Sequence, residues 1–192
     1  VSTRGLPLFS LCHDILARCS TLDEAVALFR DDDRMCGLTI FLADTRARGA
    51  ACVEFSARHL RIVTPENGLL LHTNHYLADE MKRREVAPHP WQRNSHARLQ
   101  RLRELLGARR GSLAPKHVPG ILSDCLDPFE ERKRVTGNIM AMVNTTQSVI
   151  LSPDEDAIWV AKGDHPVSHA ERYAGFRISA LLSGDRRRYA RP

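Results

Sequence analysis

The sequence predicts an α+β fold in which helices cover antiparallel sheets, and three observations support this prediction. Hydrophobic residues recur at helical spacing near the N-terminus and again in the middle of the chain. Short apolar runs rich in β-forming residues follow each helical region. The runs within each group lie close together in the sequence, which favours antiparallel pairing. An order of helices, strands, helices and strands is typical of α+β layers.

Two amphipathic helices are predicted at the start of the chain. Leucine, isoleucine and cysteine residues recur at helical spacing over residues 7–19. Thr21-Leu22-Asp23-Glu24 is the pattern of a capping box, in which threonine and glutamate side chains bond to free backbone amides. The box predicts a second helix, and its inner face carries Leu22, Ala25, Val26 and Phe29.

Four short apolar runs follow and predict an antiparallel meander. We expect strands at residues 38–43, 51–55 and 60–63, joined by polar connections. The fourth run, Leu69-Leu70-Leu71, follows the turn Pro65-Glu66-Asn67-Gly68. It predicts a buried strand that runs into the polar cluster at residues 72–75.

The second half of the chain predicts helices and loops before its strands. Residues 77–94 are charged and contain two prolines, so we expect a loop there, with helix as an alternative for its early part. Residues 95–106 predict a helix that Ser95 caps. Residues 116–124 predict a short helix, and residues 127–137 predict a polar loop.

A second antiparallel meander is predicted towards the C-terminus. We expect its strands at residues 138–144, 148–151 and 157–162, with a polar turn at residues 152–156 between the last two. The apolar residues of 176–182 predict one further strand.

The length of 192 residues predicts one domain, or most of a larger one. We place a single, partial domain at residues 1–182 and a basic tail at residues 183–192. The net charge of +5 is concentrated in this tail and in residues 79–110. Aromatic residues do not alternate with the basic ones, so no stacking platform for nucleic acid is predicted.

Composition excludes several other classes of protein. No apolar run approaches the roughly 20 residues that cross a bilayer, and the N-terminus lacks the pattern of a signal peptide. The five cysteines are irregularly spaced without a CxxC pair, which argues against structural zinc. We therefore expect free thiols, a cytoplasmic protein, no membrane contact, and neither a metal nor a cofactor.

Asn74 is the first candidate for a catalytic residue. A buried strand that ends in several hydrogen-bonding side chains is typical of a strand that faces a cleft. An amide placed there could donate to an oxyanion, which stabilises charge that develops only in the transition state. The alternative is an ordinary turn asparagine, because asparagine is common in turns.

His72 and His75 flank this asparagine and are candidates for substrate binding, together with Tyr76. A shared metal ion is disfavoured, because residues three apart in a strand point to opposite faces. The alternative is that residues 72–75 only lead into a surface loop.

Arg98 is the second catalytic candidate. Arg98 and Arg101 lie three residues apart on the predicted helix and so share one face. One interpretation is that Arg98 reaches inward to hold a carboxylate or to order a catalytic centre. The other is that these arginines only solvate the surface of the helix.

Short segments along residues 4–166 occur in a familiar order. They are Arg4-Gly5-Leu6-Pro7, Thr21-Leu22-Asp23-Glu24-Ala25, Phe41-Leu42-Ala43-Asp44, Val53-Glu54, Thr73-Asn74-His75, Ser95-His96-Ala97-Arg98-Leu99-Gln100-Arg101-Leu102, Ile121-Leu122-Ser123-Asp124, Asn144-Thr145-Thr146-Gln147-Ser148-Val149-Ile150 and Gly163-Asp164-His165-Pro166. In this order they resemble the C-terminal part of the acyl-coenzyme A:isopenicillin N (6-aminopenicillanic acid) acyltransferase family. Its distant relatives are the choloylglycine hydrolases and penicillin V acylases, and all are cysteine N-terminal-nucleophile hydrolases.

This resemblance implies a fold and a chemistry. The fold is an αββα arrangement, with two stacked antiparallel sheets between helical layers. The chemistry is attack of a cysteine thiolate on an amide or thioester, with transfer of the acyl group to water or an amine. Asn74 would hold the oxyanion and Arg98 would stabilise the centre, while Glu54 matches a recurrent glutamate with a structural role.

The chain departs from the family pattern at the nucleophile. The family's cysteine opens the mature catalytic chain upstream of Arg4-Gly5, and Cys12 and Cys19 lie within a predicted helix instead. We therefore expect a C-terminal portion or subunit whose nucleophile comes from an N-terminal segment or a second chain. The first residue, Val1, fits a fragment, a processed chain or a valine start codon alike. A homo-oligomer would also cover open sheet edges. The alternative is a catalytically inactive, truncated member that acts as a structural or binding partner.

Overall fold

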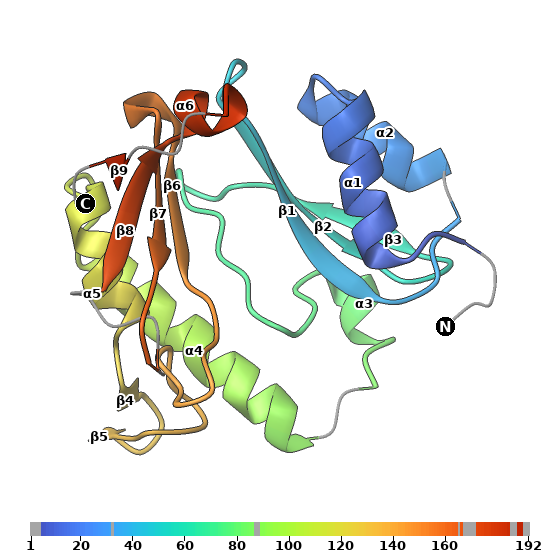
Figure 1. Cartoon of the computed structure of the whole chain (residues 1–192). Coiled ribbons are helices and arrows are strands. Elements are labelled where there is room, and N and C mark those ends of the chain that lie inside the picture. Colours follow the sequence, from blue (N-terminus) through green and yellow to red (C-terminus); the bar gives the residue numbers. More distant parts are fainter. Residues whose placement is uncertain are drawn as a thin grey trace. The chain divides into compact units, whose positions relative to one another are not determined.

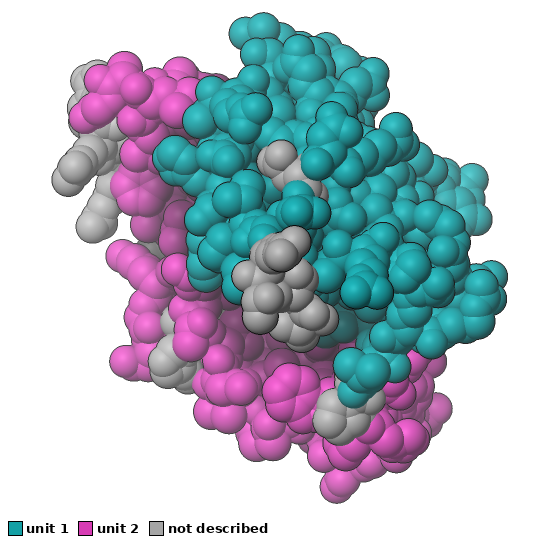
Figure 2. Space-filling view, turned by 90° about the vertical axis from the view of Figure 1, so that its right-hand side faces the viewer, with its two compact units in different colours: residues 1–88 teal, residues 89–192 magenta. Residues whose placement is uncertain are grey.

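The computed structural model describes residues 5–31, 33–86, 89–164, 166, 172–184 and 188–189 (Figure 1). The chain divides into two compact units, Val1–Pro88 and His89–Pro192, which Figure 2 colours separately. Each unit is described by itself below. The predicted single domain over residues 1–182 stays a prediction, and His165 and part of the predicted basic tail lie outside the described residues.

Unit 1 begins with the two predicted helices, α1 (Leu8–Arg18) and α2 (Leu22–Asp31). The capping box is confirmed. The Glu24 backbone amide donates to the Thr21 hydroxyl over 3.2 Å, and the Glu24 carboxylate accepts from the backbone amide of Thr21, also over 3.2 Å. It accepts from the Ser20 amide as well, over 2.6 Å. These bonds satisfy backbone donors that a helix start otherwise leaves open.

A three-stranded antiparallel sheet follows the helices in the order β1-β2-β3. The strands are β1 (Leu38–Asp44), β2 (Gly49–Phe55) and β3 (Leu60–Val63), which confirms three of the predicted strands. Val53 lies opposite Ile40 on β1 and Ile62 on β3. The central strand β2 is buried along residues 51–55, so both of its faces are covered.

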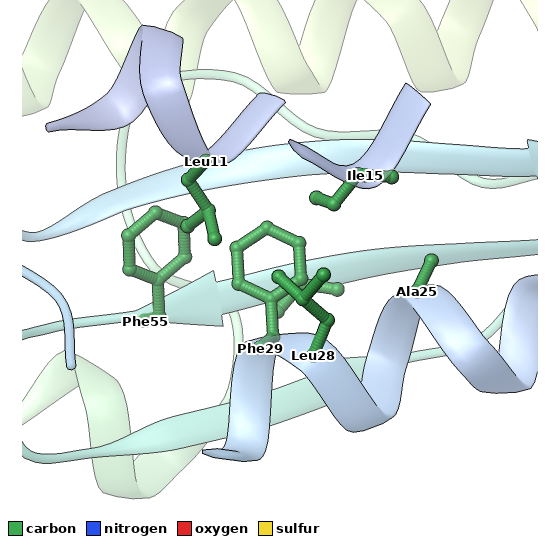
Figure 3. Close-up of a cluster of buried hydrophobic side chains, with 7 residues drawn as sticks. Leu11, Ile15, Ala25, Leu28, Phe29 and Phe55 are labelled. Atoms are coloured by element: carbon green, nitrogen blue, oxygen red, sulfur yellow. The ribbon is translucent and has the colours of Figure 1, made fainter. Parts of the chain in front are cut away.

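One face of this sheet packs against α1 and α2, as Figure 3 shows. The cluster contains Leu11, Ile15, Ala25, Leu28, Phe29, Val53 and Phe55. The rings of Phe29 and Phe55 lie 5.2 Å apart between their centroids. Alternation along β2 sends Val53 and Phe55 to this face and therefore sends Cys52 and Glu54 to the other.

The predicted fourth strand at residues 69–71 is wrong. Asn67 and Gly68 adopt positive φ angles of 52° and 78°, and the turn they make is closed by only one bridge, between Glu66 and Leu69. Beyond Leu69 the chain runs without regular structure to α3 (Asp79–Lys82). An apolar run predicts burial, but residues 69–71 are only half-buried, and the backbone of Leu69 bonds to Glu66 across the turn.

Unit 2 begins with the long helix α4 (His89–Gly107). The predicted helix at 95–106 is confirmed but starts six residues earlier, since Pro90 falls in the first turn where a missing N–H costs nothing. Ser95 therefore does not cap the helix and is buried within it. The predicted short helix at 116–124 is present as the 3-10 turn η1 (Pro115–His117) and α5 (Val118–Leu122).

A small hairpin, β4 (Leu126–Asp127) with β5 (Arg132–Lys133), occupies the predicted polar loop. The strand predicted at residues 138–144 is wrong, although Ile139 is fully buried. Asn138 adopts a φ of 59°, which a regular strand does not allow. The segment instead bonds to the preceding loop, with the Ala141 amide donating to the Asp124 carbonyl over 3.1 Å.

The second sheet has the antiparallel order β6-β7-β8-β9. Its strands are β6 (Val149–Ser152), β7 (Ala157–Ala161), β8 (Tyr173–Arg177) and β9 (Arg188–Tyr189). The turn η2 (Pro153–Glu155) joins β6 to β7, as predicted. Residues 176–182 form a strand only in part, because α6 (Ile178–Leu182) begins directly after β8.

The core of this sheet consists of Ile150, Ala157, Trp159 and Tyr173, with Val118 and Leu122 packed against it. Helices and antiparallel strands in both units agree with the predicted α+β class. The αββα layering stays a prediction. Within the described ranges, no helix combines the length and apolar character needed to cross a membrane.

We expect Phe29→Ala to destabilise unit 1 by about 3–5 kcal/mol, because the fully buried ring leaves a cavity between the helices and the sheet. Phe9→Ala is the matched control, since its ring is 85% exposed. Urea unfolding followed by circular dichroism measures both changes. Equal effects of the two variants would contradict the packing in Figure 3.

Candidate active site

Glu54 is the centre of the polar site in unit 1. It lies on β2 and points away from the helices, because its neighbours Val53 and Phe55 point toward them. Its side chain is completely buried. A buried carboxylate is costly unless hydrogen bonds and an opposite charge compensate it, so its partners determine whether this arrangement is stable.

Three donors from a single segment satisfy the Glu54 carboxylate. His72 Nε2 donates to Oε1 over 2.7 Å. The backbone amide of Leu77 donates to the same oxygen, and the amide of Ala78 donates to Oε2 over 3.0 Å. Burial by itself raises the pKa of Glu54, but these hydrogen bonds outweigh it and hold the pKa below its ordinary value.

His72 links this carboxylate to the loop that follows. Its Nδ1 lies 2.6 Å from the Thr73 carbonyl oxygen, and its Nε2 faces Glu54. Because a carbonyl and a carboxylate both only accept, a ring with protons on both nitrogens satisfies both partners. The geometry therefore favours an imidazolium–carboxylate pair at a site where each side chain is at most 1% exposed.

His75 is also buried and completes the cluster. Its Nδ1 is hydrogen-bonded to the Thr73 hydroxyl over 3.2 Å. The rings of His72 and His75 are stacked with centroids 6.5 Å apart, and the edge of Phe41 packs against His72. The two histidines thus share one environment, although an alternating strand would have separated them.

Tyr76 is fixed at the same edge of the sheet. Its hydroxyl donates to the Phe55 carbonyl over 2.8 Å, and its backbone amide donates to Glu85 over 3.3 Å. Burial, with help from neighbouring carboxylates, raises the pKa of Tyr76. The Tyr76 hydroxyl can occupy this position because residue 37 is a glycine. A Cβ on Gly37 would lie 2.6 Å from the tyrosine oxygen.

Asn74 lies between the two buried histidines and is itself exposed. It sits in a bend of a loop and not at the end of a strand, so that part of the prediction is wrong. The structure brings the rings of His72 and His75 together and attaches His72 and Tyr76 to β2. The contact of these residues with a substrate stays a prediction.

Arg98 and Arg101 lie on α4 in unit 2, and both are partly buried. Arg98 Nε donates to the Asn94 side-chain oxygen over 2.9 Å, and burial lowers the pKa of Arg98. Arg101 holds both oxygens of Asp124, over 3.0 and 2.8 Å, and this pairing raises the pKa of Arg101. Arg101 therefore binds a carboxylate, which one interpretation of the sequence had assigned to Arg98.

Asp127 is a buried polar residue that sequence reasoning missed. Its side chain is completely buried and accepts from the Asn138 amide over 2.9 Å and from Arg134 over 3.1 Å. The backbone amides of Phe129 and Glu130 also donate to it. Burial alone raises the pKa of Asp127, yet these donors bring it below the usual range. The Asp-Pro pair at residues 127–128 is a turn signal that could have indicated it.

All five cysteines are free thiols. Cys52 is buried on β2 beside Glu54, and desolvation raises its pKa to about 12. Burial also raises the pKa of Cys19 and of Cys125. In the part of the chain that the structure describes, no three histidine, cysteine or acidic side chains form a group that could hold a metal.

The comparison with known families identifies the class of protein to which the chain belongs. A family model described as acyl-coenzyme A:6-aminopenicillanic acid acyl-transferase matches residues 1–165. The chain belongs to this family, as its sequence resemblance predicted. Neither a curated protein nor a solved structure matched the chain significantly.

We expect Glu54→Gln to destabilise unit 1 by about 3 kcal/mol or more, because it removes one charge of a buried pair and aims an amide NH₂ at backbone donors. The lowered pKa of Glu54 also sets a pH dependence. The stability it supplies is present above the unfolded value of about 4.3 and is lost as the pH falls through the lower folded value.

The measurement is urea unfolding of the wild type and the variant at several values between about pH 3 and pH 7. The stability difference between them is expected to be constant near neutrality and to shrink on acidification. Glu66→Gln is the control, because its side chain is exposed at a turn. A difference that grows on acidification would contradict the ionised Glu54.

Proposed function

We propose that this chain takes part in acyl transfer from an amide or thioester through a cysteine acyl-enzyme. The observation that carries this proposal is the family match over residues 1–165. The family's description names an acyl-coenzyme A donor and a 6-aminopenicillanic acid acceptor. For this chain we propose only the bond class, a small-molecule amide or acyl thioester, since residues that select a substrate are unassigned.

Asn74 is proposed as the oxyanion donor. His72 and His75, on either side of it, are buried, and the segment is held to Glu54 by three hydrogen bonds. The hydrogen bonds to Glu54 fix the loop that carries the exposed amide. Such an amide needs little reorganisation when charge develops on a reacting carbonyl. This geometry supports preorganisation better than a mobile surface asparagine would.

His72, His75 and Tyr76 are proposed to shape the substrate site. All three side chains bond to the protein itself. His72 bonds to Glu54, His75 to the Thr73 hydroxyl and Tyr76 to the Phe55 carbonyl. The main contribution of His72, His75 and Tyr76 is therefore to hold the loop that carries Asn74. Any direct contact with substrate would come from the remaining faces of these side chains.

Arg98 is proposed to stabilise the catalytic centre. Asn94 holds its Nε, which orients the guanidinium along one side of α4. Burial lowers the pKa of Arg98, yet a guanidinium remains charged at neutral pH. A partly desolvated cation is a stronger electrostatic partner than one on an open surface.

The nucleophile is proposed to come from an N-terminal segment or a second chain. An attacking thiolate forms a C–S bond to the acyl carbon and expels an amine or thiolate, and an amine or water then releases the acyl group. Cys52 is unsuited to this, because it is buried and its pKa is raised to about 12. Cys12 lies inside α1, and burial raises the pKa of Cys19 and Cys125.

The raised pKa values of Cys52, Cys19 and Cys125 also favour a second candidate function. In it the chain is a catalytically inactive family member that serves as a structural or binding partner. A protein of that kind would keep the fold without an activated thiol. Supplying a cysteine-bearing segment or chain separates the two functions, because only the enzyme gains activity from it.

We expect Asn74→Ala to lower kcat for acyl transfer by about 10²–10³, as removal of one oxyanion donor does in other acyl-transfer enzymes. The assay follows acyl-coenzyme A cleavage and amide hydrolysis by the chain together with the cysteine-bearing segment or chain. Asn67→Gly is the control, because it removes an exposed amide at a turn with a φ of 52° that glycine tolerates. Unchanged activity of Asn74→Ala would remove the proposed role.

We expect Arg98→Lys to lower activity as well, since a lysine cannot reproduce the planar guanidinium that Asn94 orients. The control is Arg103→Lys on the exposed face of the same helix. Activity and thermal stability are measured for both. A loss of stability without a loss of activity in the folded protein would assign Arg98 a structural role.

A further inference from the structure

Four arginines of unit 1 surround an open cavity of about 520 Å³. Its lining consists of Arg30, Arg34, Arg58, Leu60, Arg61 and Ile62. Leu60 and Ile62 belong to β3 and also pack against the hydrophobic cluster beneath it. The cavity is thus built on the sheet, and its volume falls in the range of small-molecule sites, about 300–1,000 Å³.

Arg34 is the fixed member of this group. Its side chain is buried, with the residue 7% exposed. Nε donates to the Ser56 carbonyl over 3.1 Å, and one terminal nitrogen donates to the Phe29 carbonyl. These bonds connect the end of α2 to the end of β2 and hold the guanidinium in place.

The other three arginines reach the cavity from separate elements. Arg30 lies in the last turn of α2, and Arg61 on β3 is paired with Glu80 of α3. Arg58 lies in the turn between β2 and β3, which is closed by the Ser56 amide donating to the His59 carbonyl over 2.8 Å. Among the described residues, Arg30 and Arg58 have no ion-pair partner.

Cations also lie near His59, which follows Arg58 in the same turn. Burial lowers the pKa of His59, and the nearby cations Arg84, Arg61 and Arg58 lower it further. Like charges that share a cavity repel one another, and an anion that binds among them relieves this cost. Guanidinium groups bind phosphate oxygens through paired hydrogen bonds, which favours phosphate among anions.

We propose that the cavity lined by these four arginines binds a small molecule that carries two or more phosphate groups. Glu80 offsets one of the four charges, and Asp33 lies close enough to act on Arg34. Arg30 and Arg58 make no ion pair within the described ranges, so their guanidinium groups suit a ligand with more than a single negative charge. The site is distinct from the Asn74 loop and needs no catalysis to be detected.

The ligand could be a free polyphosphate or the phosphorylated carrier of an acyl thioester. The second source rests on the proposed function, because coenzyme A carries a diphosphate and a further phosphate at the end remote from its thiol. The first source does not. Binding experiments with defined probes separate them.

The test is isothermal titration calorimetry of the full chain with inorganic pyrophosphate. The variant R30Q/R58Q is compared with R103Q/R110Q, which removes the same charge from exposed positions outside the cavity. We expect wild-type binding that R30Q/R58Q weakens about tenfold or more, through loss of two charge-assisted contacts. We expect R103Q/R110Q to change it less than about twofold, because distant exposed charges are screened.

Two further variants and probes make the test decisive. If R30Q/R58Q does not fold, as judged by circular dichroism, R58Q alone replaces it, since this residue is exposed in a turn. Equal weakening by both double variants, no heat up to about 10 mM pyrophosphate, or citrate binding as tightly as pyrophosphate would each overturn the proposal. Displacement of pyrophosphate by 3′,5′-ADP and coenzyme A at lower concentrations assigns the site to the carrier. Displacement only by simple phosphates assigns it to a free ligand.

The proposal and the proposed function can fail separately. Pyrophosphate binding by Asn74→Ala is expected to match the wild type, because this residue does not line the cavity. Loss of acyl transfer with intact pyrophosphate binding bears on the proposed function and leaves the phosphate site standing. Loss of cavity-dependent binding with intact acyl transfer overturns the phosphate site alone.

Discussion

The buried carboxylate of Glu54 is the contact on which the organisation of unit 1 depends. Helices cover one face of β2, and the segment of residues 72–78 covers the other through this single side chain. A carboxylate without partners would be too costly to bury there. The partners are two backbone amides and an imidazole. The Glu54 carboxylate therefore also determines the path of residues 72–78.

This arrangement fixes the backbone on either side of the exposed Asn74. The histidines on either side of Asn74 are buried, and the backbone beyond them is bonded to a strand of the sheet. Arg98 on α4 is positioned differently. Its side chain is held by a hydrogen bond to Asn94, four residues earlier on the same helix. Both solutions hold a polar group by neighbours on rigid elements, which is what a catalytic or binding constellation requires.

Sequence reasoning was wrong where backbone groups bond within loops. Residues 69–71 and 138–144 are apolar enough to predict strands, yet residues 69–71 are only half-buried and Val143 is 51% exposed. The backbone of Leu69 bonds to Glu66 across a tight turn, and the Ala141 amide donates to the Asp124 carbonyl of a preceding loop. Ser95 was misplaced for a different reason, since a cap residue and a small buried residue of a helix are the same amino acid in the sequence.

What the sequence by itself determined is local. The Thr21–Glu24 capping box, the hairpin of β1 with β2, and the helix around Arg98 depend on neighbours within a few residues, and the order of such segments was enough to indicate the family. Only the tertiary structure decided that Glu54 pairs with His72 and that Arg30, Arg34, Arg58 and Arg61 gather around one cavity. These groups come from separate elements, and the packing of those elements, not their spacing along the chain, brings them together.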